Sequence, residues 1–296
     1  MNILISVDDK YLEISKVMLF SLKNNVSKEI HVYVFFQGDN NTFDSFKRAM
    51  NEMGMDVFKI EVEENLVQGL RVGLHYSAAM YFRILAHLLL PENIDRVLYL
   101  DADLIIKKDI TEFYEQDFED TYLVVCEDKN ADREDISNQK EKLGISKEHK
   151  YFNSGVLLMN LKKMREDISK EVLVSNIVKL QNVVLYPDQD ILNTIYENKA
   201  KYNEYSKYNF QVPQRDKTLK SQLLYAYVIH FTGENKPWLY KGIVSNKSKY
   251  FWHYKCMMNK TYLWEYVYTY ILGIAYEVCR KIKRIPMKIF RKLVKG

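Results

Sequence analysis

The stretch RVLYLDAD, residues 96–103, decides the fold of this chain, because a run of strand type ends there in two aspartates. In an extended chain, residues two apart point to the same side, so Asp101 and Asp103 are expected to lie together. Two neighbouring carboxylates repel each other unless a cation lies between them, which favours a metal site. The alternative is that one aspartate caps a helix and the other continues into a solvated turn.

Strands and helices are expected to alternate on both sides of this stretch. Runs of β-branched and aromatic residues predict strands, and apolar residues at helical spacing predict helices. The expected strands are Asn2–Val7, Ile30–Phe36, Asp56–Val62, Arg96–Leu100, Tyr122–Cys126, Asn153–Leu161 and Val228–Phe231, and the expected helices are Leu12–Lys23, Thr42–Met53, Ala78–Leu89, Ile168–Gln181 and Ile191–Asn198. This order predicts an α/β fold with a mostly parallel, doubly wound sheet, whose ligands bind outside the carboxyl ends of the strands.

A histidine lies at the end of the last predicted strand. His230 lies in VIHFTGENKPW, residues 228–238, ahead of Gly233, which permits close backbone approach, and Lys236, a point charge suited to phosphate. Such a histidine is either a hydrogen-bonded structural residue or a metal ligand. As a ligand beside carboxylates it favours Mn²⁺ over Mg²⁺, because Mg²⁺ prefers an all-oxygen shell.

A second Asp-x-Asp triplet occupies residues 188–190. It follows Pro187 at the start of a helical segment, so one of its acids is expected to cap that helix. The chain contains no GxGxxG, GxxxxGK[ST], GxSxG or HExxH motif, which argues against dinucleotide-binding, P-loop, serine hydrolase and zinc protease classes.

The composition is that of a globular protein from a reducing compartment. Of 296 residues, 47% are hydrophobic and 28% are charged, which argues against disorder. The three cysteines have no CxxC spacing, which argues against a disulfide framework and a structural zinc site. No basic segment followed by an apolar segment precedes Asp8, so we expect no signal peptide and a cytoplasmic location.

Six short motifs follow one another along the chain. They are SVDDKY (residues 6–11), YFRIL (81–85), LYLDAD (98–103), FNSGV (152–156), PDQD (187–190) and HFTGENKPW (230–238). In this order they resemble the motifs of glycosyltransferase family 8, which includes bacterial lipopolysaccharide galactosyl- and glucosyltransferases and glycogenin. The resemblance implies a single GT-A-type nucleotide-sugar domain.

The resemblance also implies a UDP-sugar donor, a divalent metal and a role for each motif residue. The implied metal ligands are Asp101, Asp103 and His230. The implied contacts to the nucleotide and its diphosphate are Val7, Asp8, Asp9, Lys10, Asp101, Ala102, Gly233 and Lys236. The resemblance implies that Asn153, Asp188 and Gln189 line the donor hexose and that Arg83 neutralises the donor's charge or holds the sugar. Asp128 is a looser candidate for a contact to the acceptor or the sugar. Lys10 stands where the family commonly has asparagine, which leaves its own contact open.

These roles describe a retaining hexosyltransferase that uses Mn²⁺, or alternatively Mg²⁺. Mn²⁺ and Lys236 would stabilise charge on the departing UDP. Because an amide is a poor nucleophile, we expect the acceptor hydroxyl to attack from the face of the departing phosphate, with Gln189 as a positioning group. Covalent attack by Gln189 or Asp188 is the alternative.

The donor is expected to be UDP-glucose or UDP-galactose, and the acceptor a glycan or glycolipid such as lipopolysaccharide. Two other functions compete with this one. A glycogenin-like protein would glucosylate itself, for which the 23 tyrosines offer superficial candidates. A non-catalytic module would bind nucleotide sugars without turnover.

The C-terminal residues differ from the rest of the chain in charge. The whole chain carries a net charge of +4, but residues 280–296 hold eight basic residues and no acidic one. Ahead of them, Tyr262–Cys279 is rich in aromatic residues, yet too short and too charged for a confident membrane span. We expect a catalytic domain over residues 1–253 and a tail over residues 254–296 that binds anionic lipid at the inner face of the membrane, not nucleic acid. The alternative is a terminal helix packed on the domain.

Overall fold

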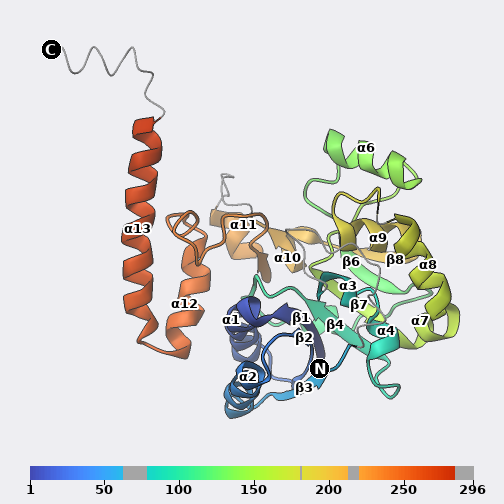
Figure 1. The fold of residues 1–296 in the computed structure, drawn as a ribbon, viewed down its shortest axis with the longest axis horizontal. Coiled ribbons are helices and arrows are strands. Elements are labelled where there is room, and N and C mark those ends of the chain that lie inside the picture. The colour runs from blue at the N-terminus through green and yellow to red at the C-terminus, as the bar shows by residue number, and fades with distance from the viewer. Residues whose placement is uncertain (63–78, 181, 213–219, 284–296) are drawn as a thin grey trace. The chain divides into compact units, whose positions relative to one another are not determined.

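The computed structural model describes residues 1–62, 79–180, 182–212 and 220–283 (Figure 1). The chain divides into two compact units. The first comprises Met1–Gln211 and Leu219–His230, and the second comprises Val212–Thr218 and Phe231–Gly296. The domain boundary expected after residue 253 falls within helix α12 (Ser248–Met258) and stays a prediction.

The first unit is built on a seven-stranded sheet with the strand order β3-β2-β1-β4-β7-β6-β8. The strands are β1 (Asn2–Asp8), β2 (His31–Gln37), β3 (Asp56–Ile60), β4 (Arg96–Leu100), β6 (Leu123–Cys126), β7 (Val156–Asn160) and β8 (Ala200–Asn203). Among the described strands of this sheet, β7 alone runs antiparallel to its neighbours. The predicted α/β fold with a mostly parallel central sheet is therefore confirmed.

Helices cover both faces of this sheet and bury two apolar clusters. Ile3 and Ile5 of β1 pack with residues of α1 (Asp9–Asn25) and α2 (Asn40–Glu52), which lie on one side of β1–β3 (Figure 1). Leu4 points to the opposite face, because side chains alternate along a strand, and it joins the second cluster. The remaining helices of this unit are α3 (Ala79–Phe82), α4 (Ala86–Leu89), α5 (Thr111–Tyr114), α6 (Glu134–Leu143), α7 (Leu161–Asp167), α8 (Lys170–Leu180), α9 (Pro187–Ile195), α10 (Tyr205–Tyr208) and α11 (Lys220–Tyr225).

The direction of β7 brings a loop to the carboxyl end of β4. Val156, the first residue of β7, pairs with Leu100, the last residue of β4. The backbone N–H of Asp101 then donates to the carbonyl of Gly155 at 2.9 Å. A parallel neighbour would present its own carboxyl end at this edge, whereas β7 presents the loop that precedes it.

A second, three-stranded sheet joins the same edge. Its order is β5 (Leu104–Ile106), β10 (Val228–His230) and β9 (Phe210–Gln211). β10 runs antiparallel to β5, with His230 opposite Leu104, and parallel to β9, with His230 opposite Gln211. This pairing places His230 beside the residues that follow β4, although more than a hundred residues separate them in sequence.

Several predicted elements differ from those in the structure. The helix expected over Ile191–Asn198 is α9, which begins at Pro187 and ends at Ile195, the helix expected from Ile168 begins at Lys170, and the strand expected to Val62 ends at Ile60. Ala78 and Gln181, at the ends of two expected helices, lie outside the described residues.

The helix expected over Ala78–Leu89 is two short helices, α3 and α4, joined by a turn over residues 83–85. In this turn Ile84 N–H donates to Tyr81 and Leu85 N–H donates to Phe82, the i→i+3 pattern that tightens a helix end. The strand expected from Asn153 begins only at Val156, because Asn153 Oδ1 accepts from the Gly155 backbone and forms a turn.

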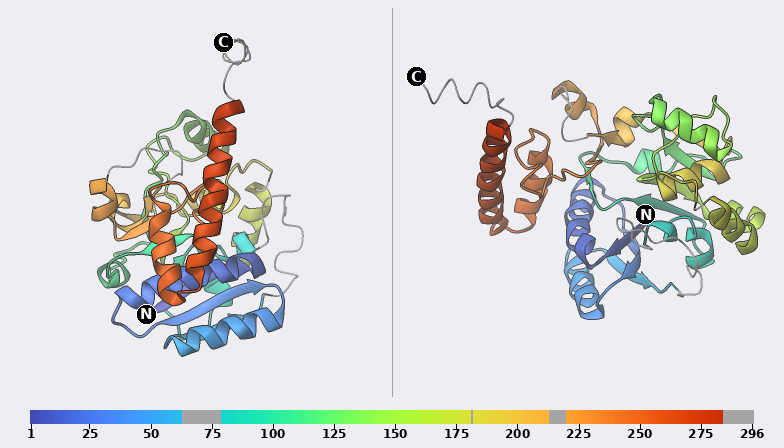
Figure 2. Two further views of the ribbon diagram at one scale, coloured as in Figure 1. Left: turned by 90° about the vertical axis from the view of Figure 1, so that its left-hand side faces the viewer. Right: turned by 45° about the horizontal axis from the view of Figure 1, so that its top comes forward.

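The second unit contains α12 and α13 (Tyr262–Lys283), which lie side by side as a helical hairpin (Figures 1 and 2). Trp252 Nε1 donates to the Pro237 carbonyl at 2.9 Å and ties α12 to the loop before it. Large apolar side chains are exposed along α13, and Trp264 is 78% exposed. Among the described residues, no helix is both long and apolar enough to span a membrane.

Candidate active site

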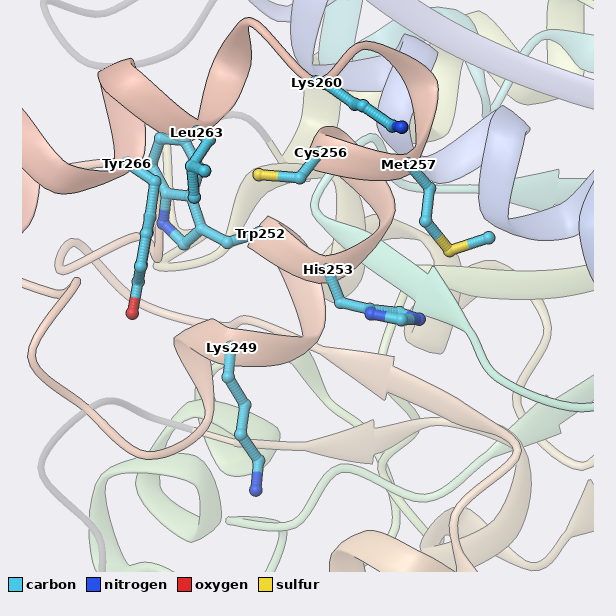
Figure 3. Close-up of a pocket in the computed structure, with 8 residues that line it drawn as sticks. All are labelled: Lys249, Trp252, His253, Cys256, Met257, Lys260, Leu263 and Tyr266. Atoms are coloured by element: carbon cyan, nitrogen blue, oxygen red, sulfur yellow. The ribbon is translucent and has the colours of Figure 1, made fainter.

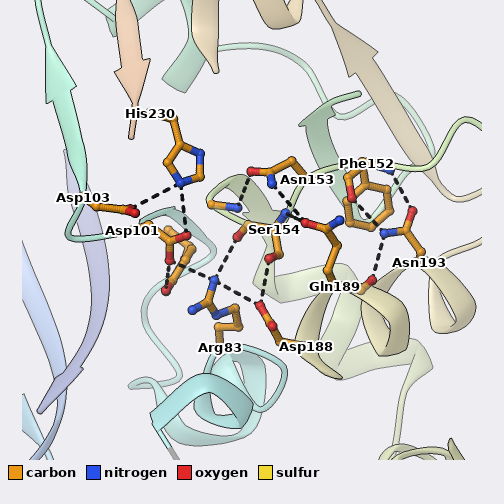
Figure 4. A network of polar contacts seen from close by, with 12 residues as sticks. Arg83, Asp101, Asp103, Phe152, Asn153, Ser154, Asp188, Gln189, Asn193 and His230 are labelled. Atoms are coloured by element: carbon orange, nitrogen blue, oxygen red, sulfur yellow. Dashed lines mark hydrogen bonds and ion pairs between the residues drawn. The ribbon is translucent and has the colours of Figure 1, made fainter. Parts of the chain in front are cut away.

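The first Asp-x-Asp triplet and His230 form a compact cluster (Figure 4). His230 Nε2 lies 3.3 Å from Asp103 Oδ1 and 3.7 Å from Asp101 Oδ2. One ligand atom from each of the three residues lies within 4.8 Å of the others. His230 and Asp103 are buried, while Asp101 is more open to solvent.

These three side chains fit a divalent cation of the transition series. They offer two carboxylates and one imidazole, a donor set that suits Mn²⁺ better than Mg²⁺. The other imidazole nitrogen, His230 Nδ1, lies 2.9 Å from Asn209 Oδ1. Histidines that ligate metals almost always have such a partner on their second nitrogen. Strand β10 therefore supplies the ligand, and the residue before its parallel neighbour β9 supplies the support.

Gly155 makes the cluster possible by its lack of a side chain. A Cβ atom at this position would lie 2.7 Å from Asp101 Oδ2 and would also collide with the His230 ring. Any larger residue would push the aspartate and the histidine apart. The glycine of the FNSGV motif is thus required by the close approach of β7 to the cluster.

Arg83 connects the first triplet to the second. Its Nη1 lies 2.9 Å from Asp101 Oδ1, 3.2 Å from Asp188 Oδ2 and 3.1 Å from the Ser154 carbonyl. The guanidinium also stacks on the Tyr99 ring at 4.3 Å, and Tyr99 donates to Asp101 at 2.7 Å. Burial lowers the pKa of Arg83, but the neighbouring carboxylates, Asp101 first, raise this pKa above its ordinary value. Arg83 therefore stays charged and holds both triplets in one network.

Amide side chains form the other half of the network. Gln189 Oε1 accepts from Asn153 Nδ2 at 3.0 Å and from the Ser154 backbone at 3.2 Å. Gln189 Nε2 and Asn153 Nδ2 both donate to Asp128 Oδ2 at 3.2 Å. Ser154 Oγ donates to Asp188 Oδ2 at 2.8 Å. The structure thus brings together all four residues expected around the donor sugar, together with the looser candidate Asp128, and adds Ser154 to them.

The last acid of the second triplet is turned away from this network. Asp190 is fully buried and accepts hydrogen bonds from Tyr151 Oη, from Gln139 Nε2 at 2.9 Å, and from the backbone of Leu185 and Tyr186 at 2.6 and 3.0 Å. Burial raises the pKa of Asp190 above its ordinary value. Asp190 therefore anchors the segment that leads into α9. The N-cap of α9 is Tyr186, which makes no side-chain cap hydrogen bond, so the expectation that one acid of this triplet caps the helix is wrong.

The residues expected to hold the nucleotide lie at the carboxyl end of β1. Asp8 accepts from the Tyr11 backbone at 3.0 Å and caps α1, and Asp9 Oδ1 accepts from the Asp39 backbone at 3.1 Å. Because β1 and β4 are parallel neighbours, this end of β1 and Asp101 share one edge of the sheet. Val7 and Ala102 are buried, while Lys10 is exposed and lies 6.0 Å from the Tyr11 ring.

Gly233 and Lys236 belong to the second unit. Gly233 has a φ of 83°, which glycine adopts without strain. Lys236 Nζ donates to the Phe231 carbonyl at 2.8 Å. Their roles toward a diphosphate stay predictions.

The second unit also contains a pocket of about 570 Å³ between α12 and α13 (Figure 3). Its walls are mostly apolar, with Trp252, Leu263 and Tyr266 at one side and Lys249 and Lys260 at the margin. It presents no carboxylate among its lining residues. The acid, amide and guanidinium groups of the first unit are the better candidate for chemistry.

Asn209 is the site residue that sequence reasoning missed. It is fully buried, contacts His230, and also donates from Nδ2 to Asn153 Oδ1 at 2.9 Å. It lies directly before β9, a strand of two residues that has no recognisable periodicity. The only signal that could have found it is the pairing of β9 with β10, which is not visible in a single sequence.

Comparison with known proteins gives a family and a fold. The model of glycosyl transferase family 8 matches residues 2–242. The lipopolysaccharide 1,2-glucosyltransferase of Escherichia coli K12 is 30% identical over 271 residues, which are 85% of this chain and 76% of that protein. General stress protein A of Bacillus subtilis is 25% identical over 257 residues, which are 80% of this chain and 87% of that protein.

Solved structures share the fold. The galactosyltransferase LgtC, crystallised with donor and acceptor sugar analogues, superposes with a TM-score of 0.75 over 90% of this chain and 100% of that one, at 23% identity. GlyE of Streptococcus pneumoniae superposes with a TM-score of 0.62 over 88% of this chain and 63% of that one, at 21% identity. The expected GT-A-type fold is therefore confirmed.

Proposed function

This chain belongs to glycosyltransferase family 8, and we propose that it transfers glucose or galactose from a UDP-sugar to a glycan or glycolipid with retention of the anomeric configuration. Its relative in Escherichia coli is a lipopolysaccharide glucosyltransferase, and LgtC, a galactosyltransferase, binds donor and acceptor sugar analogues. A cell-surface polymer such as lipopolysaccharide is accordingly the proposed acceptor.

The Asp101–Asp103–His230 cluster carries this proposal. It would hold Mn²⁺, which when bound offsets the negative charge of a diphosphate leaving group. Hydrogen bonds and an ion pair from Tyr99, Arg83 and Asn209 orient the members of the cluster. Such preorganisation is the principal source of electrostatic stabilisation in enzymes.

Two groups of residues would bind the nucleotide part of the donor. Val7, Asp8, Asp9, Lys10 and Ala102 lie at the edge of the sheet where nucleotides bind in open α/β folds. Gly233 and Lys236 would contact the diphosphate, since a glycine with positive φ permits close backbone approach and a lysine supplies a positive charge.

The amide network would bind the hexose. Arg83 Nε has no hydrogen-bond partner among the described residues, although it is buried, so one donor remains for a sugar or phosphate oxygen. Asn153, Asp188 and Gln189 lie around this guanidinium within the same network.

The network favours attack by the acceptor hydroxyl from the face of the departing phosphate. Gln189 Oε1 already accepts two hydrogen bonds, and Asp188 Oδ2 is paired with Arg83 and Ser154 Oγ. Both side chains are therefore held as positioning groups and are poorly placed to move as nucleophiles. The phosphate oxygen would accept the proton of the acceptor hydroxyl.

The C-terminal helix would bring the enzyme to its acceptor at the cytoplasmic face of the membrane. α13 exposes Trp264, Tyr268 and Ile271. Aromatic and aliphatic residues followed by basic residues are typical of helices that lie at an anionic lipid surface. Removal of residues 254–296 should release the protein from anionic vesicles, and unchanged co-sedimentation would contradict this part of the proposal.

The function is tested by UDP release from a panel of UDP-sugars, with and without Mn²⁺, for the intact protein and Asp103→Ala. We expect turnover of one UDP-hexose that requires Mn²⁺ and the aspartate. Growth in the protein's own mass would instead support self-glucosylation. Binding of UDP-sugars without turnover, even with purified surface glycan supplied, would support a non-catalytic module.

A further inference from the structure

Two asparagine side chains form a chain of hydrogen bonds that ends at His230. The groups at the other end of this chain fix which atom donates and which accepts at each step. The Nδ1 atom of His230 lies 2.9 Å from Asn209 Oδ1, and Asn209 Nδ2 lies 2.9 Å from Asn153 Oδ1. All three side chains are buried, and Asn209 has no exposed surface. Water therefore does not compete for these hydrogen bonds, and each amide must face a partner of the opposite kind.

Two groups of fixed character set the orientation of Asn153. The Gly155 backbone N–H can only donate, and it donates to Asn153 Oδ1 at 3.0 Å. The Asp128 carboxylate accepts, and it receives Asn153 Nδ2 at 3.2 Å. A flip of the Asn153 amide would place NH₂ against N–H and oxygen against oxygen, so both ends oppose it.

The orientation of the Asn153 amide fixes that of the Asn209 amide, which in turn fixes the tautomer of the His230 imidazole. Since Asn153 Oδ1 is an acceptor, Asn209 must donate to it with Nδ2, which leaves Asn209 Oδ1 as an acceptor toward His230. A neutral imidazole has one N–H and one lone pair. The N–H therefore belongs on Nδ1, and the lone pair of Nε2 faces Asp101 and Asp103.

We propose that Asn209 is a positioning residue that holds His230 in the Nδ1–H tautomer, so that Nε2 is available to bind a cation. The inference rests on the proposed function, because a metal ligand needs this lone pair. In the other tautomer, Nε2–H would donate to Asp103 Oδ1, 3.3 Å away, and the histidine and aspartate would satisfy each other instead of a metal.

The tautomer can be observed directly by ¹⁵N NMR of histidine-labelled, metal-free protein at a pH where the imidazole is neutral. The chain has six histidines, and His230→Gln identifies the signals of this one. We expect a protonated Nδ1 and an unprotonated Nε2. This measurement on the unaltered protein decides the assignment even if a variant fails to fold.

Substitutions at residue 209 test whether Asn209 causes the Nδ1–H tautomer of His230. Asn209→Leu removes the acceptor, so we expect the Nε2–H tautomer to appear and the affinity for Mn²⁺ to fall roughly 10- to 100-fold. Asn209→Gln keeps both the amide oxygen and the NH₂ group, so it should keep the Nδ1–H tautomer. Asn160→Leu is the control, because Asn160 is a partly buried amide at the opposite end of β7 from the cluster, where it bonds to Thr121 and Lys163. It should leave the His230 signals and the Mn²⁺ affinity unchanged.

Two results would overturn the proposal. One is an Nε2–H tautomer of His230 in the unaltered protein, and the other is an Asn209→Leu variant with the same tautomer and the same Mn²⁺ affinity. Failure of the proposed function looks different. An Nδ1–H tautomer in a protein that binds no Mn²⁺ would support the role of Asn209 and contradict the metal site.

Discussion

The two Asp-x-Asp triplets have the same pattern in sequence and opposite environments in the structure. In the first, Asp101 and Asp103 both face His230, and their oxygens lie at the carboxyl edge of the sheet. In the second, Asp188 faces Arg83 and the amide network, whereas Asp190 is fully buried and accepts from two side chains and from the backbone that precedes α9. The first triplet gathers two carboxylates around one imidazole, while Asp190 accepts hydrogen bonds from four donors.

This difference shows that the role of each carboxylate depends on the groups around it and not on the Asp-x-Asp spacing. Asp101 and Asp103 lie in the turn that links β4 to β5, and both carboxylates face His230. Asp188 and Asp190 lie in the first turn of α9, where residues two apart point in different directions around the helix. One of them therefore reaches the site and the other supports the fold.

The largest expected effect is that of Asp103→Asn in the first triplet. The amide keeps the shape but loses charge next to His230, so transfer activity should fall more than about 100-fold, because changes merely around metal ligands cost 10- to 100-fold. Thermal unfolding should move little. Activity within a factor of three of the unaltered enzyme, at saturating Mn²⁺, would remove the functional distinction between the triplets.

Asp190→Ala should produce the opposite kind of defect. It leaves the Gln139 amide, the Tyr151 hydroxyl and two backbone N–H groups without their acceptor, which should lower the free energy of unfolding by roughly 3 kcal/mol or more. Urea denaturation measures this loss. The folded protein should bind Mn²⁺ with unchanged affinity; weakened binding with normal stability would mean that Asp190 belongs to the site.

Gly155→Ala tests whether the first triplet needs the close approach of the backbone at residue 155. The added methyl group would meet Asp101 Oδ2 at 2.7 Å, so the cluster must open, and Mn²⁺ affinity should fall roughly 10- to 100-fold. Gly144→Ala is the control, because Gly144 has a φ of 72° and open space around it. That change should reduce stability by about 1–2 kcal/mol through strain and leave Mn²⁺ binding intact.

The smallest effect is a pH dependence that involves neither triplet. Burial lowers the pKa of His87 from 6.5 to about 4, so the unfolded chain takes up a proton more readily than the folded one. The stability that this group contributes is present above about pH 6.5 and is lost as the pH falls toward 4. At pH 5.5 the loss should be about 1.4 kcal/mol, and His87→Gln should remove it. A variant with the same acid sensitivity in urea denaturation as the unaltered protein would contradict this assignment.

Strong local patterns allowed much of the fold to be predicted. Apolar runs such as Ile30–Phe36 and Arg96–Leu100 correspond to β2 and β4, because buried strands need such residues. β5, β8 and β9 were not predicted, since two to four residues cannot establish a periodicity. The break between α3 and α4 was not predicted either, because it depends on hydrogen bonds made by the turn at Arg83.

The site residues that lie in recognisable sequence motifs could be predicted from the sequence. Asp101, Asp103 and His230 lie together as expected, and so do Arg83, Asn153, Asp188 and Gln189. Their functional roles stay predictions. Asn209 could not be found because its importance comes from a neighbour brought by strand pairing, and a buried asparagine has no pattern of its own.

The most direct test of the account is pulsed EPR of Mn²⁺ added to protein labelled with ¹⁵N-histidine, in the presence of UDP. If Asp101, Asp103 and His230 hold the ion, one Mn²⁺ binds per chain and shows coupling to a histidine ¹⁵N nucleus. That coupling should disappear in His230→Ala and persist in Asp190→Ala. Bound Mn²⁺ without histidine coupling, or coupling that survives in His230→Ala, would contradict the claim that the first triplet and His230 form the metal site.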